Sequence, residues 1–288
     1  MKSPEEPLAV SAPLALRMAP TLCRRDPETG ESCAWNHAPW QLFRLMGLVM
    51  TPALHADFYR GALATLVRAK SRPRVLISAA ADYCMLAQAL AILRSLDADP
   101  EVTVVDVCET PLMLNRWYAE RVGCPVRTCR SDILEYRDDR PFDLVCTHSF
   151  LGRFTREQRV ALLARWRDLL RPGGAAITVN RVQDAPRVAF TEEQSRAFRA
   201  TVLRAAESLR GSMEVDLEEL ARQVDAYVSH PAGHPVRTRE EFLEPFERAG
   251  FALEHVSCAP VSAGVRRDVE GPRVPGDAVY GRIIAIRR

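Results

Sequence analysis

Lysine is almost absent from this sequence, and so are long apolar runs. Among 39 basic residues only Lys2 and Lys70 are lysine, and the arginines are spread among 37 acidic residues. No basic stripe stands out from this mixture, so we expect no nucleic-acid partner. No window reaches the ~18 apolar residues of a membrane span, and Pro13 and Arg17 interrupt the N-terminal apolar stretch, unlike a signal peptide. We therefore expect a cytoplasmic protein with no membrane partner.

The eight cysteines include no C-x-x-C pair, and no histidine cluster lies near them at the spacing of a zinc site. Such cysteines are typical of reduced thiols that pack as small apolar groups. The sequence thus predicts no metal site.

The middle of the chain, residues 71–180, alternates short apolar runs with helix-length amphipathic segments. The runs read RVLISA, VTVVDV, PVRTCR, FDLVCTHS and AAITVN. This rhythm predicts βαβ units, and hence the α/β class with a Rossmann-like, doubly wound and mainly parallel sheet.

The flanking segments depart from this rhythm. Residues 1–70 carry apolar residues at helical spacing and predict an N-terminal helical lid. Residues 181–237 contain two helix starts, at Thr191 and Asp216, with no strand between them, which predicts an inserted helical cap. Residues 238–288 predict a final helix that begins after Thr238 and two strands that complete the sheet.

Ligands of a parallel sheet bind at the carboxyl ends of the strands, so the residues after each apolar run are candidates for a site. Asp106 ends the second run, about 25 residues after the turn that follows the first, which is the separation at which nucleoside binders place an acid for the ribose hydroxyls. Asp132 follows the third run and His148 ends the fourth. The turn after the first run reads Ala-Ala-Ala-Asp-Tyr over residues 79–83, where nucleotide-binding folds place glycines.

Taken in order, these features resemble the class I S-adenosylmethionine-dependent methyltransferases. The resemblance rests on the first turn, Asp106, Asp132 and the LRPGG turn before the fifth run, and TREEFLEPFERAGFALEHV is similar to the closing helix and strand of that family. It implies S-adenosylmethionine as cofactor, with Asp106 on the ribose and Asp132 facing the adenine amino group. The cofactor-binding residues that it implies are Ser78, Ala79, Ala81, Asp82, Tyr83, Asp106, Val107, Cys108, Asp132, Ile133, Thr147 and His148.

The first turn departs from the family, which usually has glycines near Ala79, Ala81 and Tyr83. Alanine replaces glycine without strain only where φ is negative, so we expect negative φ in this turn. One interpretation is a degenerate turn that no longer binds the cofactor. The interpretation we favour is a rebuilt methionine pocket, in which Asp82 accepts a hydrogen bond from the α-ammonium and Tyr83 packs over the methionine arm.

Methyl transfer needs chiefly alignment, and a base is required only when the acceptor arrives protonated. His148 is the first catalytic candidate, as a base or acceptor-positioning group, and Tyr83 is the second. Three functions stay open. They are methyl transfer to a small molecule, cyclisation or cleavage of the cofactor's aminobutyrate arm with release of 5′-methylthioadenosine, and non-catalytic binding by a protein that kept the fold.

Overall fold

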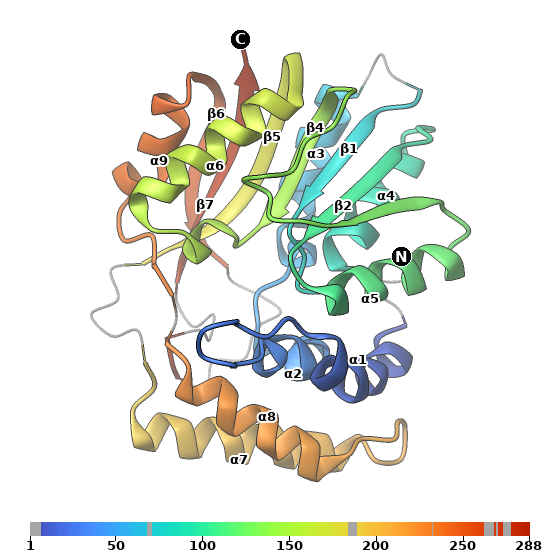
Figure 1. The fold of residues 1–288 in the computed structure, drawn as a ribbon, viewed down its shortest axis with the longest axis vertical. Coiled ribbons are helices and arrows are strands. Elements are labelled where there is room, and N and C mark those ends of the chain that lie inside the picture. Colours follow the sequence, from blue (N-terminus) through green and yellow to red (C-terminus); the bar gives the residue numbers. More distant parts are fainter. Residues whose placement is uncertain are drawn as a thin grey trace.

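A seven-stranded sheet forms the centre of the computed structural model, in the order β3-β2-β1-β4-β5-β7-β6 (Figure 1). The structure describes residues 7–67, 71–183, 189–231, 233–261, 268, 270–272 and 278–288. The strands are β1 (Arg74–Ser78), β2 (Glu101–Asp106), β3 (Val126–Arg130), β4 (Phe142–His148), β5 (Leu170–Val182), β6 (Phe251–Pro260) and β7 (Val279–Arg287). The pairs among β1 to β5 are parallel, and β7 runs antiparallel to both β5 and β6. The predicted α/β class and mainly parallel sheet are therefore confirmed.

Helices cover both faces of this sheet. The helical elements are α1 (Leu8–Leu22), α2 (Ala34–Leu45), η1 (Pro52–His55), α3 (Ala56–Leu66), α4 (Cys84–Arg94), α5 (Glu109–Arg121), η2 (Leu151–Arg153), α6 (Arg156–Leu169), α7 (Glu192–Ser208), α8 (Leu217–Ser229) and α9 (Arg239–Arg248). In β1, Val75 and Ile77 pack with α3, α4 and α5, whereas Leu76 packs on the opposite face with α6 and α9. The strand is apolar on both faces, as is typical of a parallel strand covered by helices.

Four helices from distant parts of the chain form a separate layer below the sheet in Figure 1. Helices α1 and α2 share an apolar cluster with α7 and α8, and its aromatic centre joins Phe43 to Phe198 and Tyr227. The predicted helix starts are confirmed, since Thr191, Asp216 and Thr238 each accept a backbone N–H as N-caps. Helix α3 instead packs against the sheet. The domain boundaries at residues 70, 180 and 237 stay predictions.

The backbone of the LRPGG turn requires glycine at both of its glycine positions. Gly173 has φ +72°, and a Cβ on Gly174 would lie 2.9 Å from the carbonyl oxygen of Arg171. A side chain at Gly174 would therefore clash with backbone, and the pairing of β4 with β5 shifts register next to this turn.

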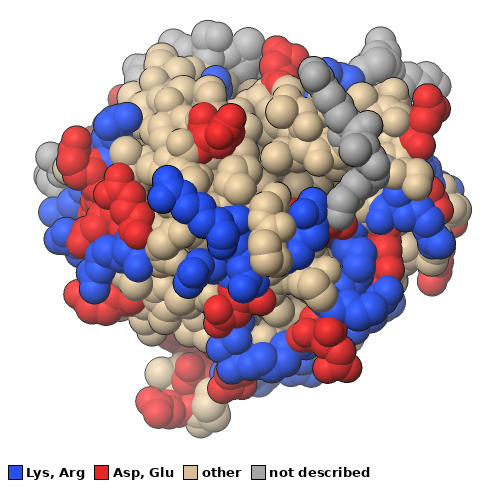
Figure 2. Space-filling model, turned by 90° about the horizontal axis from the view of Figure 1, so that it is seen from above, with Lys and Arg blue, Asp and Glu red and all other residues tan. Residues whose placement is uncertain are grey.

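The charged surface is mixed in sign. Figure 2 shows basic and acidic side chains interleaved on the face seen from above. Ion pairs are frequent, as where Arg74 contacts Glu101 and Asp138, at 3.3 Å in both cases. None of the described helices has the length and apolar character to cross a membrane. The absence of a nucleic-acid partner stays a prediction.

Candidate active site

A cavity of about 430 Å³ lies at the carboxyl ends of β1 to β4, where the order of the strands reverses. Both its position and its size are those of small-molecule sites in open α/β sheets, which hold roughly 300–1,000 Å³. The predicted site residues that line it are Ala79, Ala81, Asp82, Asp106, Val107, Cys108, Asp132, Ile133 and His148. Residues from α2 and from the loop that follows β4 line the opposite side.

Ser78, Tyr83 and Thr147 do not line this cavity. The Ser78 hydroxyl accepts a hydrogen bond from the indole N–H of Trp166 at 2.9 Å, and its carbonyl accepts one from the Thr147 hydroxyl at 2.8 Å. These two residues hold β1, β4 and α6 together behind the cavity wall.

Asp106 is fixed by backbone hydrogen bonds at the end of β2. Its Oδ2 accepts the N–H of Ala80 at 3.0 Å, and its Oδ1 accepts the N–H of Cys108 at 2.8 Å. Burial raises the pKa of this carboxyl above its usual range, while His37 and the two backbone donors act to lower it. Each oxygen accepts more than one hydrogen bond when ionised. The carboxylate is therefore oriented and still able to accept from a pair of hydroxyls.

Asp132 and Ile133 follow β3 on the same side of the cavity. The Oδ1 of Asp132 accepts the N–H of Leu134 at 2.9 Å, whereas the Ile133 side chain is buried. An acid and an apolar side chain thus lie next to each other, as an aromatic base with an amino group requires.

The first turn is strained at one alanine. Ala79 has φ +64°, so the expectation of negative φ is wrong at this position. Ser149, which also lines the cavity, has φ +52° at the end of the neighbouring strand β4. The left-handed conformation costs a residue with a Cβ roughly 1–2 kcal/mol, and such strain often occurs at functional sites.

We expect Ala79→Gly to raise the free energy of unfolding by about 0.5–1 kcal/mol. Relief of the left-handed strain outweighs the extra unfolded-state entropy of glycine. Ala81→Gly is the matched control, because Ala81 does not have positive φ, and it should lower the free energy by about the same amount. Urea unfolding of both variants tests this expectation, and equal losses would contradict it.

The side chains of Asp82 and Tyr83 contact the N-terminal helices. Asp82 is 2% exposed, forms an ion pair with Arg44 of α2 and accepts a hydrogen bond from the Gln41 amide at 3.1 Å. Tyr83 is fully buried, and its hydroxyl lies 2.9 Å from the Ser11 hydroxyl of α1. The ring of Tyr83 stacks on Tyr118 at a centroid distance of 4.6 Å.

This placement differs from the predicted methionine pocket. Tyr83 lies outside the cavity, and its catalytic and cofactor roles stay predictions. The Asp82 carboxylate is already neutralised by Arg44. The turn therefore has large residues in place of glycine because it anchors α1 and α2.

His148 lies half-buried in the cavity wall, and its hydrogen bonds determine which ring nitrogen carries the proton. The Tyr59 hydroxyl donates to the Thr147 carbonyl at 2.8 Å and lies 3.4 Å from the Nδ1 of His148. Since that hydroxyl hydrogen is already used, we assign the proton to Nδ1 as the donor to Tyr59. The buried Nε2 has no hydrogen-bond partner among the described residues and is left as an acceptor. Burial, assisted by His55, holds the pKa of His148 well below its usual range.

His55 is a second buried histidine, with a ring centroid 5.4 Å from that of His148. Burial, with a smaller contribution from Arg282, lowers the pKa of His55 to about 4. Between this value and the unfolded value near 6.5, the unfolded chain takes up a proton that the folded chain excludes. Folding stability should therefore fall as the pH drops from about 6.5 to 4.

We expect the loss of folding stability at low pH to be smaller in His55→Gln, because glutamine does not titrate. The wild-type chain should lose on the order of 3 kcal/mol more than the variant over this pH range, since one pKa unit corresponds to about 1.4 kcal/mol. Urea unfolding at pH 7, 5.5 and 4.5 measures the difference. Parallel stability curves for the two proteins would contradict the assignment of a buried neutral His55.

The sequence did not point to three residues of the opposite wall. Phe150, Arg153 and Phe154 follow β4 and line the cavity together with Trp35 and Trp40 of α2. The Arg153 guanidinium donates to the Asn36 side-chain oxygen of α2 at 3.1 Å. The available signal was the position of these three residues directly after a predicted strand.

A family comparison matches the part of the chain that carries this site. Residues 85–174 match the family model described as "Methyltransferase domain". This span includes Asp106, Asp132 and His148. This part of the chain is similar to a methyltransferase domain. The cofactor of this family is S-adenosylmethionine, which agrees with the predicted cofactor.

Solved structures similar to this chain share its fold at low sequence identity. Magnesium protoporphyrin IX methyltransferase from Synechocystis PCC 6803, with bound SAH, is 12% identical with a TM-score of 0.50, covering 88% of this chain and 96% of that one. The pyocyanin biosynthetic protein PhzM is 16% identical with a TM-score of 0.47, covering 81% and 55%. TehB from Haemophilus influenzae is 12% identical with a TM-score of 0.49, covering 83% and 64%.

The chain thus spans less than two thirds of the length of PhzM and of TehB. The comparison with curated proteins found no match. The structural likeness at such low identity concerns the fold, so the acceptor has to be argued from the cavity.

Proposed function

We propose that this chain transfers a methyl group from S-adenosylmethionine to a small-molecule acceptor. The observation that carries the proposal is the oriented carboxylate of Asp106 at the carboxyl end of β2, in the wall of the cavity. Its remaining lone pairs suit two vicinal hydroxyls, as in a ribose.

The cavity residues fit the adenosine half of the cofactor. Asp106 would hold the ribose, Asp132 would accept from the adenine amino group, and Ile133 with Val107 or Cys108 would contact the ring. When bound, the cofactor supplies an activated methyl group. Asp82, held by Arg44, is the acid of the first turn that lines the cavity and would face the methionine end of the cofactor.

The other wall of the cavity suggests the class of acceptor. Trp35, Trp40, Phe150 and Phe154 give this side an aromatic surface. Nε2 of His148, which the low pKa keeps unprotonated, would accept a hydrogen bond from an acceptor hydroxyl, amine or thiol and align it. We propose a compact aromatic acceptor with one such group.

Product analysis tests this function directly. The purified chain is incubated with S-adenosylmethionine and a panel of small phenols, aromatic amines and aromatic thiols. We expect S-adenosylhomocysteine to form only when an acceptor is present, and to be lost in Asp106→Ala but kept in the surface control Asp99→Ala. Enzyme-dependent 5′-methylthioadenosine formed without any acceptor would contradict methyl transfer. Absence of cofactor binding by calorimetry would contradict an enzymatic function altogether.

A further inference from the structure

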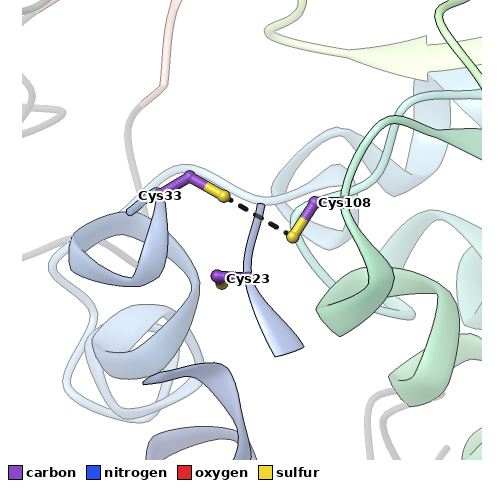
Figure 3. Close-up of side chains that lie close together, drawn as sticks. All are labelled: Cys23, Cys33 and Cys108. Atoms are coloured by element: carbon purple, nitrogen blue, oxygen red, sulfur yellow. Dashed lines mark hydrogen bonds between the residues drawn. The ribbon is translucent and has the colours of Figure 1, made fainter. Parts of the chain in front are cut away.

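Three cysteines that are far apart in the sequence meet beside the cavity. The sulfur atoms of Cys23, Cys33 and Cys108 all lie within 4.8 Å of one another, and Cys33 and Cys108 are 3.5 Å apart. Figure 3 shows Cys33 and Cys108 pointing toward each other from separate elements. Cys23 is the C-cap of α1, whereas Cys33 and Cys108 are the N-caps of α2 and α5.

A buried histidine lies beside this group and is the candidate for a fourth ligand. His37, one turn into α2, is 8% exposed and interacts electrostatically with Cys108. Its Nδ1 lies 3.3 Å from the carbonyl oxygen of Ala81. Because a carbonyl only accepts, Nδ1 carries a proton, and Nε2 is the ring nitrogen left for the thiols. Metal-binding histidines commonly donate their second ring N–H to a backbone carbonyl in this way.

We propose that Cys23, Cys33, Cys108 and His37 bind one Zn²⁺ ion. Three sulfurs and one imidazole nitrogen form a common tetrahedral ligand set for structural zinc. Zinc–sulfur bonds of about 2.3 Å place tetrahedral sulfur atoms about 3.8 Å apart, so the observed separations need only small side-chain movements. Cys33, His37 and Cys108 also line the cavity, but metal binding here does not depend on the proposed methyl transfer.

The backbone holds the three cysteines in place before any ion binds. Residues 24–32 form a short hairpin in which the Cys33 N–H donates to the Arg24 carbonyl at 3.1 Å, and Arg25 bridges Ser32. The hairpin brings Cys23 and Cys33 together at its base. Cys108 is held by its own N–H, which donates to Asp106 at 2.8 Å.

Zn²⁺ binds deprotonated thiols and a neutral imidazole, so binding releases the protons that these ligands carry. It would form three Zn–S bonds and one Zn–N bond with no change of oxidation state. Arg153, which interacts electrostatically with Cys33, offsets the remaining negative charge.

An ion at this position would join three helix ends. It would fasten α1 and α2 to the start of α5, next to the Asp106 loop, and through His37 to the first turn at Ala81. The expected result is that metal stabilises the layer of N-terminal helices over the cavity.

Metal titration of the full chain, reduced and stripped of metal, tests the site without any cofactor. We expect one Zn²⁺ per chain with a Kd of about nanomolar or lower by competition with a chromogenic chelator. Co²⁺ should give the thiolate-to-metal absorption and the strong visible bands of tetrahedral coordination. Cys33→Ser, a half-buried position chosen to preserve the fold, should weaken binding by more than about a hundredfold, since loss of an outer partner alone costs about 10–100-fold.

The control is Cys258→Ser, which removes an exposed cysteine on β6 and should bind Zn²⁺ as the wild-type chain does. His37→Ala should weaken binding and reduce the intensity of the Co²⁺ visible bands, while its circular dichroism stays that of the wild type. A folded wild-type chain without thiolate-to-Co²⁺ absorption would overturn the proposal. So would Zn²⁺ affinity that is unchanged in Cys33→Ser, or a Cys33–Cys108 disulfide whose reduction restores no metal binding.

Discussion

Asp106→Ala is expected to weaken binding of S-adenosylmethionine by about a hundredfold or more. Two hydrogen bonds from ribose hydroxyls to an ionised carboxylate contribute roughly 1.5–3 kcal/mol each, and 1.4 kcal/mol corresponds to a factor of ten. Isothermal calorimetry with S-adenosylmethionine and with S-adenosylhomocysteine measures the loss. Both ligands should be affected equally, because they share the ribose.

Two further variants distinguish loss of the ribose contact from disruption of the loop that Asp106 holds. Asp106 also accepts the N–H groups of Ala80 and Cys108, which Asp106→Asn can still satisfy in part. Asp106→Asn should therefore lose less affinity than the alanine variant. Asp99→Ala, at an acid that is 80% exposed, should bind as the wild type does. Unchanged affinity in a folded Asp106→Ala protein would mean that this acid is structural.

Arg44→Met is expected to lower the free energy of unfolding by about 3–5 kcal/mol. The ion pair with Asp82 is buried, with Arg44 0% and Asp82 2% exposed. Removal of one partner leaves a buried charge without compensation, which is far more costly than the net stabilisation by the intact pair. Urea unfolding followed by circular dichroism measures the change.

The double variant Arg44→Met/Asp82→Asn tests the cause. It should be more stable than Arg44→Met, since no unpaired charge remains. The matched surface control is Arg199→Met, whose ion pair with Asp225 is about half exposed on both sides and should contribute less than about 1 kcal/mol. A similar loss in Arg44→Met and Arg199→Met would contradict the importance of burial.

The sheet and the acids at its edge could be predicted because they depend on local sequence. The continuous apolar runs give the buried strands, and Asp106 and Asp132 follow these strands directly in the chain. Strand order brings both acids to one cavity. The position of an acid relative to a strand end is therefore sufficient to place it in a parallel sheet.

The first turn could not be predicted in the same way. Whether Ala79 adopts positive φ depends on its hydrogen bond to the Val105 carbonyl at 2.9 Å, which lies in a neighbouring strand. Tyr83 was expected to pack over the methionine arm, but its hydroxyl contacts Ser11 of α1 and its ring stacks on Tyr118 of α5. The partners of both residues are distant in sequence.

The cysteine cluster could not be predicted either, because its members are distant in sequence. Zinc-site patterns in sequences rely on ligands in close pairs, whereas Cys23 and Cys33 are joined by a hairpin and Cys108 follows another strand. Only the three-dimensional contact between the α1–α2 connection and the start of α5 brings these sulfurs together.

The shared core of α1, α2, α7 and α8 has a consequence for the order of assembly during synthesis. Helices α1 and α2 leave the ribosome before any strand of the sheet, but the apolar partners of Phe43, in α7 and α8, follow only after β5. Contacts between such distant segments form late, because a long loop must close first. The nascent helices α1 and α2 therefore expose apolar surface until α8 has emerged. Only then does the four-helix layer assemble.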